Sequence, residues 1–440
     1  MWEEIPSRNL RPQTRRRFFR FREELSSRVA IESLKCKECG TDYPLDARFV
    51  CEQCFGPLEV AYDHSGLVPD EAKRKIQAGS QGIWRYSDFL PFETDSRPGD
   101  PLEPGLTPLV KADRLAERLG LGEVWVKNDA ANPTHSFKDR VVAVAVAKAK
   151  ELGFETVACA STGNLANAVA AHAAAAGLDS YVFVPADLEE QKLLATGIYG
   201  TNLVGVKGNY DDVNRLCTEL AQTRPWAFVN VNLRPYYAEG SKTLAFETIE
   251  QLGWELPDRI VSPIASGSLF TRLGRAMTDW IDLGLVEGEL PTFNGAQAEG
   301  CSPVATAFNE GWDVCKPQKP DTIAKSLAIG DPADGPYAVE LARRTGGAVD
   351  MVNDDEIRAG IRLLAETTGI FTETAGGVTV AVLAKLAERG DISREERVVV
   401  YITGEGLKTL DAARESFAMH EIEPTMDAFE DEFKLDAAAV

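Results

Sequence analysis

The chain has 440 residues, of which 44% are hydrophobic, and this length and composition predict a soluble globular protein of two or three domains. Its formal net charge of -21 would repel phosphate backbones and anionic lipid surfaces, so neither nucleic acid nor a membrane is expected as a partner. The sequence has no run of about 18 apolar residues and no charged-then-apolar start typical of a secretory signal, which favours a cytoplasmic protein.

An N-terminal arm over 1–33 carries a basic cluster that is unusual in so acidic a chain. Five arginines are interleaved there with three phenylalanines, namely Arg15, Arg16, Arg17, Phe18, Phe19, Arg20, Phe21 and Arg22. We expect this arm to pack on an acidic neighbour or on the body of its own chain, with a nucleic-acid-binding patch as the alternative. The acidic Glu3 and Glu24 count against an organelle transit peptide.

Two CxxC pairs follow within 34–63, which we expect to form a small ribbon-like module. Cys36 and Cys39 make the first pair, and Cys51 and Cys54 make the second. Two-residue gaps let both thiolates of a pair reach one tetrahedral ion, so the spacing predicts a zinc site in a reducing compartment. The alternative is a module of the same shape whose thiols are only buried or paired.

Beyond the module, 64–105 is expected to be a linker, because proline and glycine become frequent towards its end. Runs of β-branched residues then alternate with alanine-rich runs. The strand-like runs are 123–126, 156–160, 180–184, 260–264 and 398–402, and they precede helix-like runs at 141–152, 165–176, 188–195, 269–283 and 407–413. This alternation is typical of parallel sheets with crossover helices and predicts an α/β fold.

Ligands of open parallel sheets bind at the carboxyl ends of strands, so the turns that follow the strands are where a site is expected. Lys138 lies in the first of four unusual turns, ahead of a largely apolar helix. Poor solvation there would lower the basicity of its amine, as imine chemistry requires. The alternative is a surface lysine at a helix start that is capped by Ser136.

The other three turns are rich in small and hydroxyl-bearing residues. They comprise Ser161, Thr162, Gly163 and Asn164, then Ser266, Gly267, Ser268 and Leu269, and last Thr403. The turn 161–164 offers amides and hydroxyls to a carboxylate, although a plain helix cap would have the same residues. The turn 266–269 has side chains small enough for its amides to close around a phosphate. The hydroxyl of Thr403 suits a ring nitrogen.

Together the four turns match, in order and spacing, those of fold-type II pyridoxal-phosphate enzymes, and from about residue 34 to about residue 413 the chain resembles the threonine synthase family. The matching segments are NPTHSFKDR at 132–140, STGNLANAVAAHAA at 161–174, NLRPYYAEGSKT at 232–243, AEGCSPVATAF at 298–308, IGDPADGPYA at 329–338, GIFTETAGGVT at 369–379 and TGEGLKT at 403–409. The resemblance implies a homodimer that uses pyridoxal 5'-phosphate. It also implies a large α/β domain over 106–145 and 240–425, a small mobile one over 146–239, and a C-terminal tail over 426–440.

The resemblance assigns a role to each turn. Lys138 would hold pyridoxal phosphate as a Schiff base and move protons, Asn164 would bond to the ring hydroxyl, and Thr403 would face the pyridine nitrogen. The turn 266–269 would bind the cofactor's phosphate. The residues 161–163 would bind the α-carboxylate of the substrate.

The group that binds the substrate's own phosphate is left open between Arg234, Lys127 and Lys242, each of which has surface or structural pairing as its alternative. Some family members carry an arginine two residues after the proline of the matching segment, where this chain has Tyr237. His135 is a second departure, because many relatives have glycine there. We expect it to be a turn residue without a chemical role.

The family's reaction converts O-phospho-L-homoserine and water to L-threonine and phosphate, and we expect this chain to catalyse it. The alternatives on the same scaffold are a cysteate synthase that uses phosphoserine and sulfite, or a serine/threonine dehydratase. A binding protein with a catalytically silent core is an alternative of another class. The complete set of Lys138, Asn164, Gly267 and Thr403 argues against it.

Overall fold

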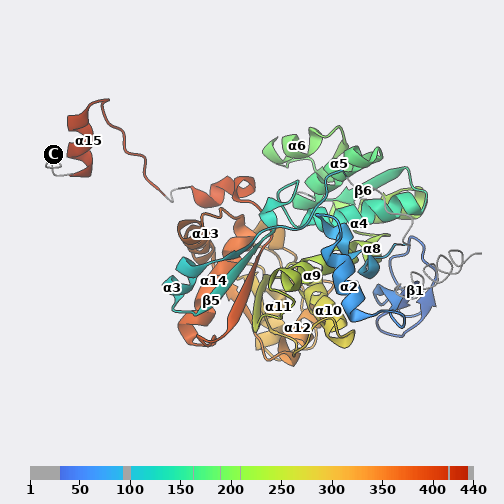
Figure 1. The fold of residues 1–440 in the computed structure, drawn as a ribbon. Helices are drawn as coiled ribbons and strands as arrows, with labels where there is room; N and C mark the ends of the chain where they lie inside the picture. Colours follow the sequence, from blue (N-terminus) through green and yellow to red (C-terminus); the bar gives the residue numbers. More distant parts are fainter. Residues whose placement is uncertain are drawn as a thin grey trace, which may run out of the picture.

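The architecture is α/β, with three sheets in the part of the chain that the structure describes. The computed structural model describes residues 30–92, 101–161, 163–188, 190–208, 210–414 and 417–434. Within these ranges the sheet orders are β2-β1-β3, β12-β11-β10-β13-β5-β4 and β8-β7-β6-β9. Figure 1 shows the two larger sheets with their helices, and the small N-terminal sheet beside them. The predicted fold class is confirmed.

The N-terminal module is an antiparallel sheet of three strands. These are β1 (Ala30–Cys36), β2 (Asp42–Tyr43) and β3 (Leu58–Asp63). The module begins earlier than the expected residue 34, because β1 already pairs with β3 at Ala30 opposite Asp63. Tyr62 donates a hydrogen bond to Glu239 of the body at 2.7 Å. The basic cluster predicted in the arm lies outside the described residues.

The expected linker over 64–105 is wrong for its first half, which is helical and packed. It contains α2 (Pro69–Gln77) and the 3₁₀ helix η1 (Ile83–Phe89). Proline begins α2 because the first turn of a helix needs no N–H from it. Ile76 and Phe89 are buried, and the Phe89 ring contacts Trp280 of the main core. The proline-rich part begins only at Pro91. The composition that predicted a linker therefore does not apply to the helical segment before it.

The six-stranded sheet is parallel except at one edge. Its strands are β4 (Leu109–Lys111), β5 (Glu123–Asn128), β10 (Arg259–Pro263), β11 (Thr292–Ala298), β12 (Val349–Val352) and β13 (Arg397–Ile402). Only β4 runs antiparallel to its neighbour among these described strands. The predicted strands at 123–126, 260–264 and 398–402 are confirmed. Because β10, β13 and β5 are consecutive, their carboxyl ends lie side by side.

Helices cover both faces of this sheet, and each face has its own hydrophobic core. One face carries α9 (Lys242–Gln251), α10 (Ser268–Asp282), α11 (Pro303–Asn309) and α12 (Gly335–Arg344). The other carries α3 (Asp113–Leu119), α13 (Asp354–Thr368) and α14 (Thr374–Arg389), with the short η3 (Lys325–Leu327) nearby. None of the helices in the described ranges combines the length and the apolar composition that crossing a membrane would need.

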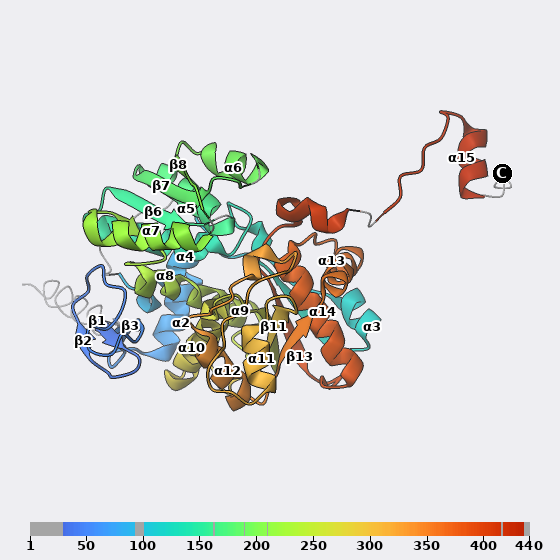
Figure 2. The ribbon, with the colours of Figure 1, turned by 180° about the vertical axis from the view of Figure 1, so that it is seen from behind.

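The four-stranded sheet and its helices form a second unit, here called the small-sheet unit. Its strands, all parallel, are β6 (Thr156–Ala160), β7 (Asp179–Pro185), β8 (Asn202–Val206) and β9 (Ala227–Phe228). Its helices are α4 (Lys138–Glu151), α5 (Asn164–Ala176), α6 (Glu190–Gly197), α7 (Tyr210–Thr223) and α8 (Arg234–Gly240). Helix α4 is buried on nearly every side, which accounts for its small and apolar residues (Figure 2).

Two C-terminal elements differ from expectation. The helix predicted over 407–413 is the 3₁₀ helix η4 (Gly406–Ala413), interrupted at Thr409, where φ is -138°. The expected tail over 426–440 contains α15 (Met426–Phe433), which begins because the Thr425 side chain caps Ala428 N. No residue of α15 is buried, and Figures 1 and 2 both show it standing away from the body.

A buried cluster of charges joins β5 to helices α4 and α9. Arg140 lies 2.8 Å from both Asp129 and Glu247, and Lys127 forms a second ion pair with Glu247. Burial alone would raise the pKa of Glu247, but the facing Arg140 and Lys127 lower it to about 2. Two cations thus face two carboxylates away from water, so removal of one partner leaves an uncompensated charge.

We expect Glu247→Gln to lower the free energy of unfolding by about 3 kcal/mol at pH 7, because Lys127 and Arg140 then share one buried carboxylate. Denaturant unfolding measures this, with the exposed Glu310→Gln as control. Because the pKa of Glu247 is depressed in the fold, its contribution is complete above an unfolded pKa of about 4.3 and is lost as the pH falls through about 2. Equal stability of the two variants would contradict the assignment.

Candidate active site

Lys138 is the first residue of α4, after the turn that leaves β5 through the short η2 (Asp129–Ala131). Phe137 N donates to Thr403 O at 2.9 Å, and Ser136 pairs with Gly404, so this turn lies against the turn that follows β13. His135 has a φ of 63°, a left-handed conformation that glycine adopts without strain. This backbone conformation accounts for the glycine that many relatives have at the position of His135.

Asp139 sets the direction in which α4 begins. Its carboxylate accepts hydrogen bonds from the backbone N and the hydroxyl of Thr134, both at 2.8 Å, and its Oδ1 lies 2.9 Å from His172 Nε2. All three side chains are buried. Because His172 belongs to α5, this contact joins the lysine turn to the small-sheet unit.

The amine of Lys138 lies between two aromatic side chains. Its Nζ is 3.1 Å from Tyr237 Oη on α8 and 4.5 Å from the centre of the Phe137 ring. The side chain is half-buried, so the alternative of a solvated surface lysine does not fit this position. The lysine amine lies at the edge of the large sheet where the parallel strands have their carboxyl ends.

The turn 266–269 connects β10 to the start of α10, and its backbone packs closely against Asp334. Gly267 has a φ of 93°, and a Cβ there would lie 2.7 Å from backbone atoms of Asp334. Asp334 N in turn donates to Ser266 O at 2.8 Å. The first N–H groups of a helix have no intrahelical acceptor, so this end of α10 offers donors and a positive dipole to a phosphate.

Helix α8 links this turn to the lysine. Arg234 at its start lies 2.7 Å from Asp334, beside the turn, and Tyr237 one helical turn later contacts Lys138. Side chains three residues apart on a helix are neighbours. The turn 266–269 and the lysine amine therefore lie on the same side of α8, and Arg234 is close to the turn.

The turn 161–164 reaches the large sheet through Asn164. The Asn164 amide donates to both carboxylate oxygens of Glu373 at 3.0 Å, and its Oδ1 accepts from Lys408 Nζ at 2.8 Å. Burial raises the pKa of Glu373 and lowers that of Lys408. Ser161 Oγ accepts from the N atoms of Gly163 and Ala166, both at 3.3 Å, and caps α5. Thr162 lies outside the described residues.

Glu373, Lys408 and Tyr237 lie at the site but were absent from the predicted set of site residues. Glu373 and Lys408 lie within segments that carry the family resemblance, but no motif or residue spacing around them predicts their contacts. An acidic residue within the otherwise uncharged run 369–379 is the one sequence signal that could have drawn attention to Glu373. Asn164 lies 209 residues from Glu373 and 244 residues from Lys408 in the chain, so only folding brings these three residues together.

Two candidates for the substrate's phosphate are engaged elsewhere. Lys127 is fully buried in the ion-pair cluster with Glu247, and Lys242 lies 2.6 Å from Glu239 with 3% of its side chain exposed. Each ammonium is buried with its carboxylate partner, whereas the Arg234 side chain, although paired with Asp334, is partly exposed. This geometry argues against a phosphate-binding role for either lysine and leaves Arg234 as the candidate.

The four cysteines of the N-terminal module come together. Cys36 and Cys54 lie 3.5 Å apart, as do Cys39 and Cys51, and all four sulfur atoms fall within 4.8 Å of one another. Zinc–sulfur bonds of about 2.3 Å in a tetrahedron separate the sulfurs by roughly 3.8 Å, so the cluster has the size of a zinc site. Burial alone would raise the pKa of Cys51, but hydrogen bonds from Tyr43 and backbone amides lower it to about 6.

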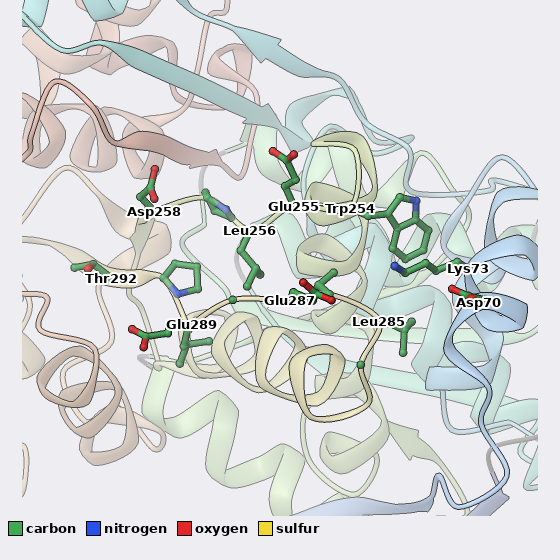
Figure 3. Close-up of a pocket in the computed structure, with 16 residues that line it drawn as sticks. Asp70, Lys73, Trp254, Glu255, Leu256, Asp258, Leu285, Glu287, Glu289 and Thr292 are labelled. Carbon is green, nitrogen blue, oxygen red and sulfur yellow. The ribbon is translucent and has the colours of Figure 1, made fainter.

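A separate cavity of about 820 Å³ opens at the other end of the large sheet, next to the amino ends of β10 and β11 (Figure 3). Its charged lining is mostly acidic and comprises Asp70, Lys73, Glu255, Asp258, Glu287 and Glu289. Ligands of parallel sheets bind at the opposite, carboxyl ends, and an acidic lining repels phosphorylated molecules. This cavity is therefore not the active-site candidate.

Comparison with known proteins shows the family to which the chain belongs. Residues 101–404 match the family described as pyridoxal-phosphate dependent enzymes. The chain is 37% identical to a threonine synthase of Methanocaldococcus jannaschii, over 86% of this chain and 93% of the relative, and 39% identical to one of Methanosarcina acetivorans, over 85% and 92%. The structure of threonine deaminase isoform 2 from Solanum lycopersicum superposes with a TM-score of 0.59 over 78% of this chain and 88% of that one, at 20% identity, which shows the fold alone.

The lysine at the start of α4 and the hydroxyl of Thr403 after β13 lie in segments that carry the resemblance, in a chain that spans nearly the whole length of these relatives. The chain therefore belongs to the threonine synthase family of pyridoxal-phosphate dependent enzymes.

Proposed function

We propose that this enzyme makes L-threonine and phosphate from O-phospho-L-homoserine and water. The observation that carries the proposal is the meeting of Lys138, Thr403 and the turn 266–269 at one edge of the large sheet, in a chain that aligns with 93% of a threonine synthase. The neighbouring strands β5, β13 and β10 supply these three parts in that order.

The residues at this edge fit pyridoxal phosphate. Lys138 offers a half-buried amine for the aldehyde, the start of α10 offers amides for the phosphate, and Thr403 offers a buried hydroxyl for the ring nitrogen. Ser136 and Thr374 lie close in the chain to Lys138 and Glu373, and their hydroxyl oxygens are buried without a hydrogen-bond partner among the described residues. Both hydroxyls can therefore form hydrogen bonds with a ligand. When bound, the cofactor supplies an electron sink for negative charge on the substrate's α-carbon.

The chain's own residues would bind the two anionic ends of the substrate. The α-carboxylate suits the start of α5, where Ser161 and the amides that follow it present hydroxyl and N–H donors. The phosphate suits Arg234, because Asp334 accepts only one of its several N–H donors in the structure. Lys138, once its amine is free, would take the α-proton and return it. Thr162 keeps the carboxylate-binding role that the sequence predicts.

We propose that the small-sheet unit, over about 146–239, closes on the large sheet when substrate binds. Asn164 supports this, since it comes from the small-sheet unit and is held by Glu373 and Lys408 of the large one. Closure would exclude water until it is needed at the β-carbon, and would bring the Asn164 amide to the ring hydroxyl of the cofactor.

We also propose that the four cysteines bind one structural zinc ion, which the sulfur distances and the CxxC spacing support. A zinc site of free thiolates needs a reducing compartment, which agrees with a cytoplasmic location. We expect the enzyme to be a homodimer, as the family resemblance implies.

The purified enzyme with pyridoxal phosphate is expected to release phosphate from O-phospho-L-homoserine and to form L-threonine in equal amount. Lys138→Ala removes the amine and should lower phosphate release and threonine formation to background. Phosphoserine with sulfite, and L-serine or L-threonine alone, serve as comparison substrates. Turnover of one of these, with none of O-phospho-L-homoserine, would replace the proposal by a cysteate synthase or a dehydratase.

Lys408→Met should lower kcat about tenfold, because Asn164 loses the hydrogen bond from Lys408 that orients its side chain at the site. Steady-state kinetics and the dissociation constant of the cofactor measure the effect. Lys385→Met is the matched control, since Lys385 bonds to the Met351 carbonyl at the edge strand β12. An unchanged kcat in Lys408→Met would refute the closing role of Asn164.

Metal analysis should find one zinc ion per chain, and Cys39→Ser should bind less than half as much and unfold at a lower temperature, because a tetrahedral site loses one of its four sulfurs. Cys315→Ser, outside the cluster, is expected to keep both properties. If the wild type carries no metal and Cys39→Ser is equally stable, the module forms without a zinc ion and the proposed metal site is wrong.

A further inference from the structure

Tyr237 contacts the amine on which the proposed chemistry depends. Its hydroxyl lies 3.1 Å from Lys138 Nζ, and the residue is 9% exposed. Within the described residues this is the hydrogen bond found for the Lys138 amine. The other close group is the ring of Phe137, which has neither a lone pair nor a polar hydrogen with which to form a directed hydrogen bond. The direction of the free amine therefore depends on Tyr237.

The position of Tyr237 is set by the packing of α8 against α4. Gly240 lies against α4 so closely that a Cβ would be 2.5 Å from Arg140 O and 2.6 Å from Val141 Cα. The missing side chain lets the two helices approach, and both ribbon views show them side by side (Figures 1 and 2). Tyr237, one turn before Gly240, then reaches Lys138.

The neighbouring Tyr236 has a different and purely structural contact. It is fully buried, and its hydroxyl donates to Asp46 O of the N-terminal module at 3.0 Å. Lys148 lies over its ring at 4.9 Å. The two adjacent tyrosines thus point to different partners, one to the module and the other to the reactive lysine. This pair offers a matched control within the same helix.

We propose that Tyr237 is the positioning residue of Lys138, an inference that rests on the function proposed above. When the amine is free and neutral, the tyrosine O–H donates to its lone pair and aims it into the site. After the amine has taken a proton from the substrate's carbon, the ammonium has three N–H donors, and the tyrosine oxygen accepts one of them. A hydroxyl supports both states, whereas phenylalanine supports neither and an arginine could only donate.

The experiment compares Tyr237→Phe with Tyr236→Phe in the full-length holoenzyme. Tyr237→Phe should lower kcat about tenfold at unchanged KM, and should slow solvent-deuterium exchange of the substrate's α-hydrogen by the same factor. Tyr236→Phe should leave both rates as in the wild type. Thermal unfolding of both variants shows whether each is folded.

A readout independent of turnover uses the apoprotein. The rate at which added pyridoxal phosphate develops the absorbance band of the lysine-bound cofactor reports how well the free amine is aimed. We expect this rate to fall about tenfold in Tyr237→Phe and to be unchanged in Tyr236→Phe. Wild-type values of exchange and attachment in Tyr237→Phe would overturn the proposal. So would a raised KM with unchanged kcat, which would make the hydroxyl a substrate-binding group.

Failure of the proposed reaction is distinguishable from failure of this inference. If the wild type forms no threonine from O-phospho-L-homoserine, but Tyr237→Phe still slows attachment of the cofactor to the apoprotein, the substrate assignment is wrong and the positioning role stands. If the wild type forms threonine and attachment is unaffected by Tyr237→Phe, the reaction stands and the positioning role is wrong.

Discussion

The adjacency of β10, β13 and β5 in one parallel sheet is the constraint on which the site depends. Each of these strands ends in a turn, and their common direction brings the three turns to one edge. The lysine turn and the turn after β13 are joined directly by the bond from Phe137 N to Thr403 O. Residues that are more than 250 positions apart in the chain thereby lie side by side at one edge of the sheet.

Helix α8 and the start of α5 complete this edge from the small-sheet unit. Helix α8 connects the turn 266–269 to the lysine through Arg234 and Tyr237, and Asn164 connects α5 to Glu373 and Lys408. These contacts are polar and few, in contrast to the buried charge cluster around Arg140 that holds α4 to the large sheet. A firm attachment at α4 with lighter contacts at α5 is what a closing unit requires.

The N-terminal module also bears on the site, through the same helices. Glu59 pairs with Arg272 of α10 at 3.0 Å, Tyr62 donates to Glu239 of α8, and Glu38 accepts a hydrogen bond from Tyr337 of α12. Helix α10 follows the turn 266–269, and helix α8 carries Tyr237, the hydrogen-bond partner of Lys138. The module therefore supports the outer side of the elements that form the site, and a metal ion that stiffens it would act on them indirectly.

The sequence by itself determined the α/β class, the strands β5, β6, β7, β10 and β13 with the helical segments that follow them, and the turns that carry Lys138, Gly267 and Thr403, because hydrophobic periodicity and turn composition are local properties of the chain. It failed where local composition misleads, as at α2 and η1, whose burial depends on a distant core. Only the tertiary structure decided that Lys127 and Lys242 are internal ion-pair partners, that Glu373 and Lys408 hold Asn164, and that Tyr237 faces Lys138. Those contacts join residues far apart in the chain, and burial and partner choice follow from packing rather than from neighbours in sequence.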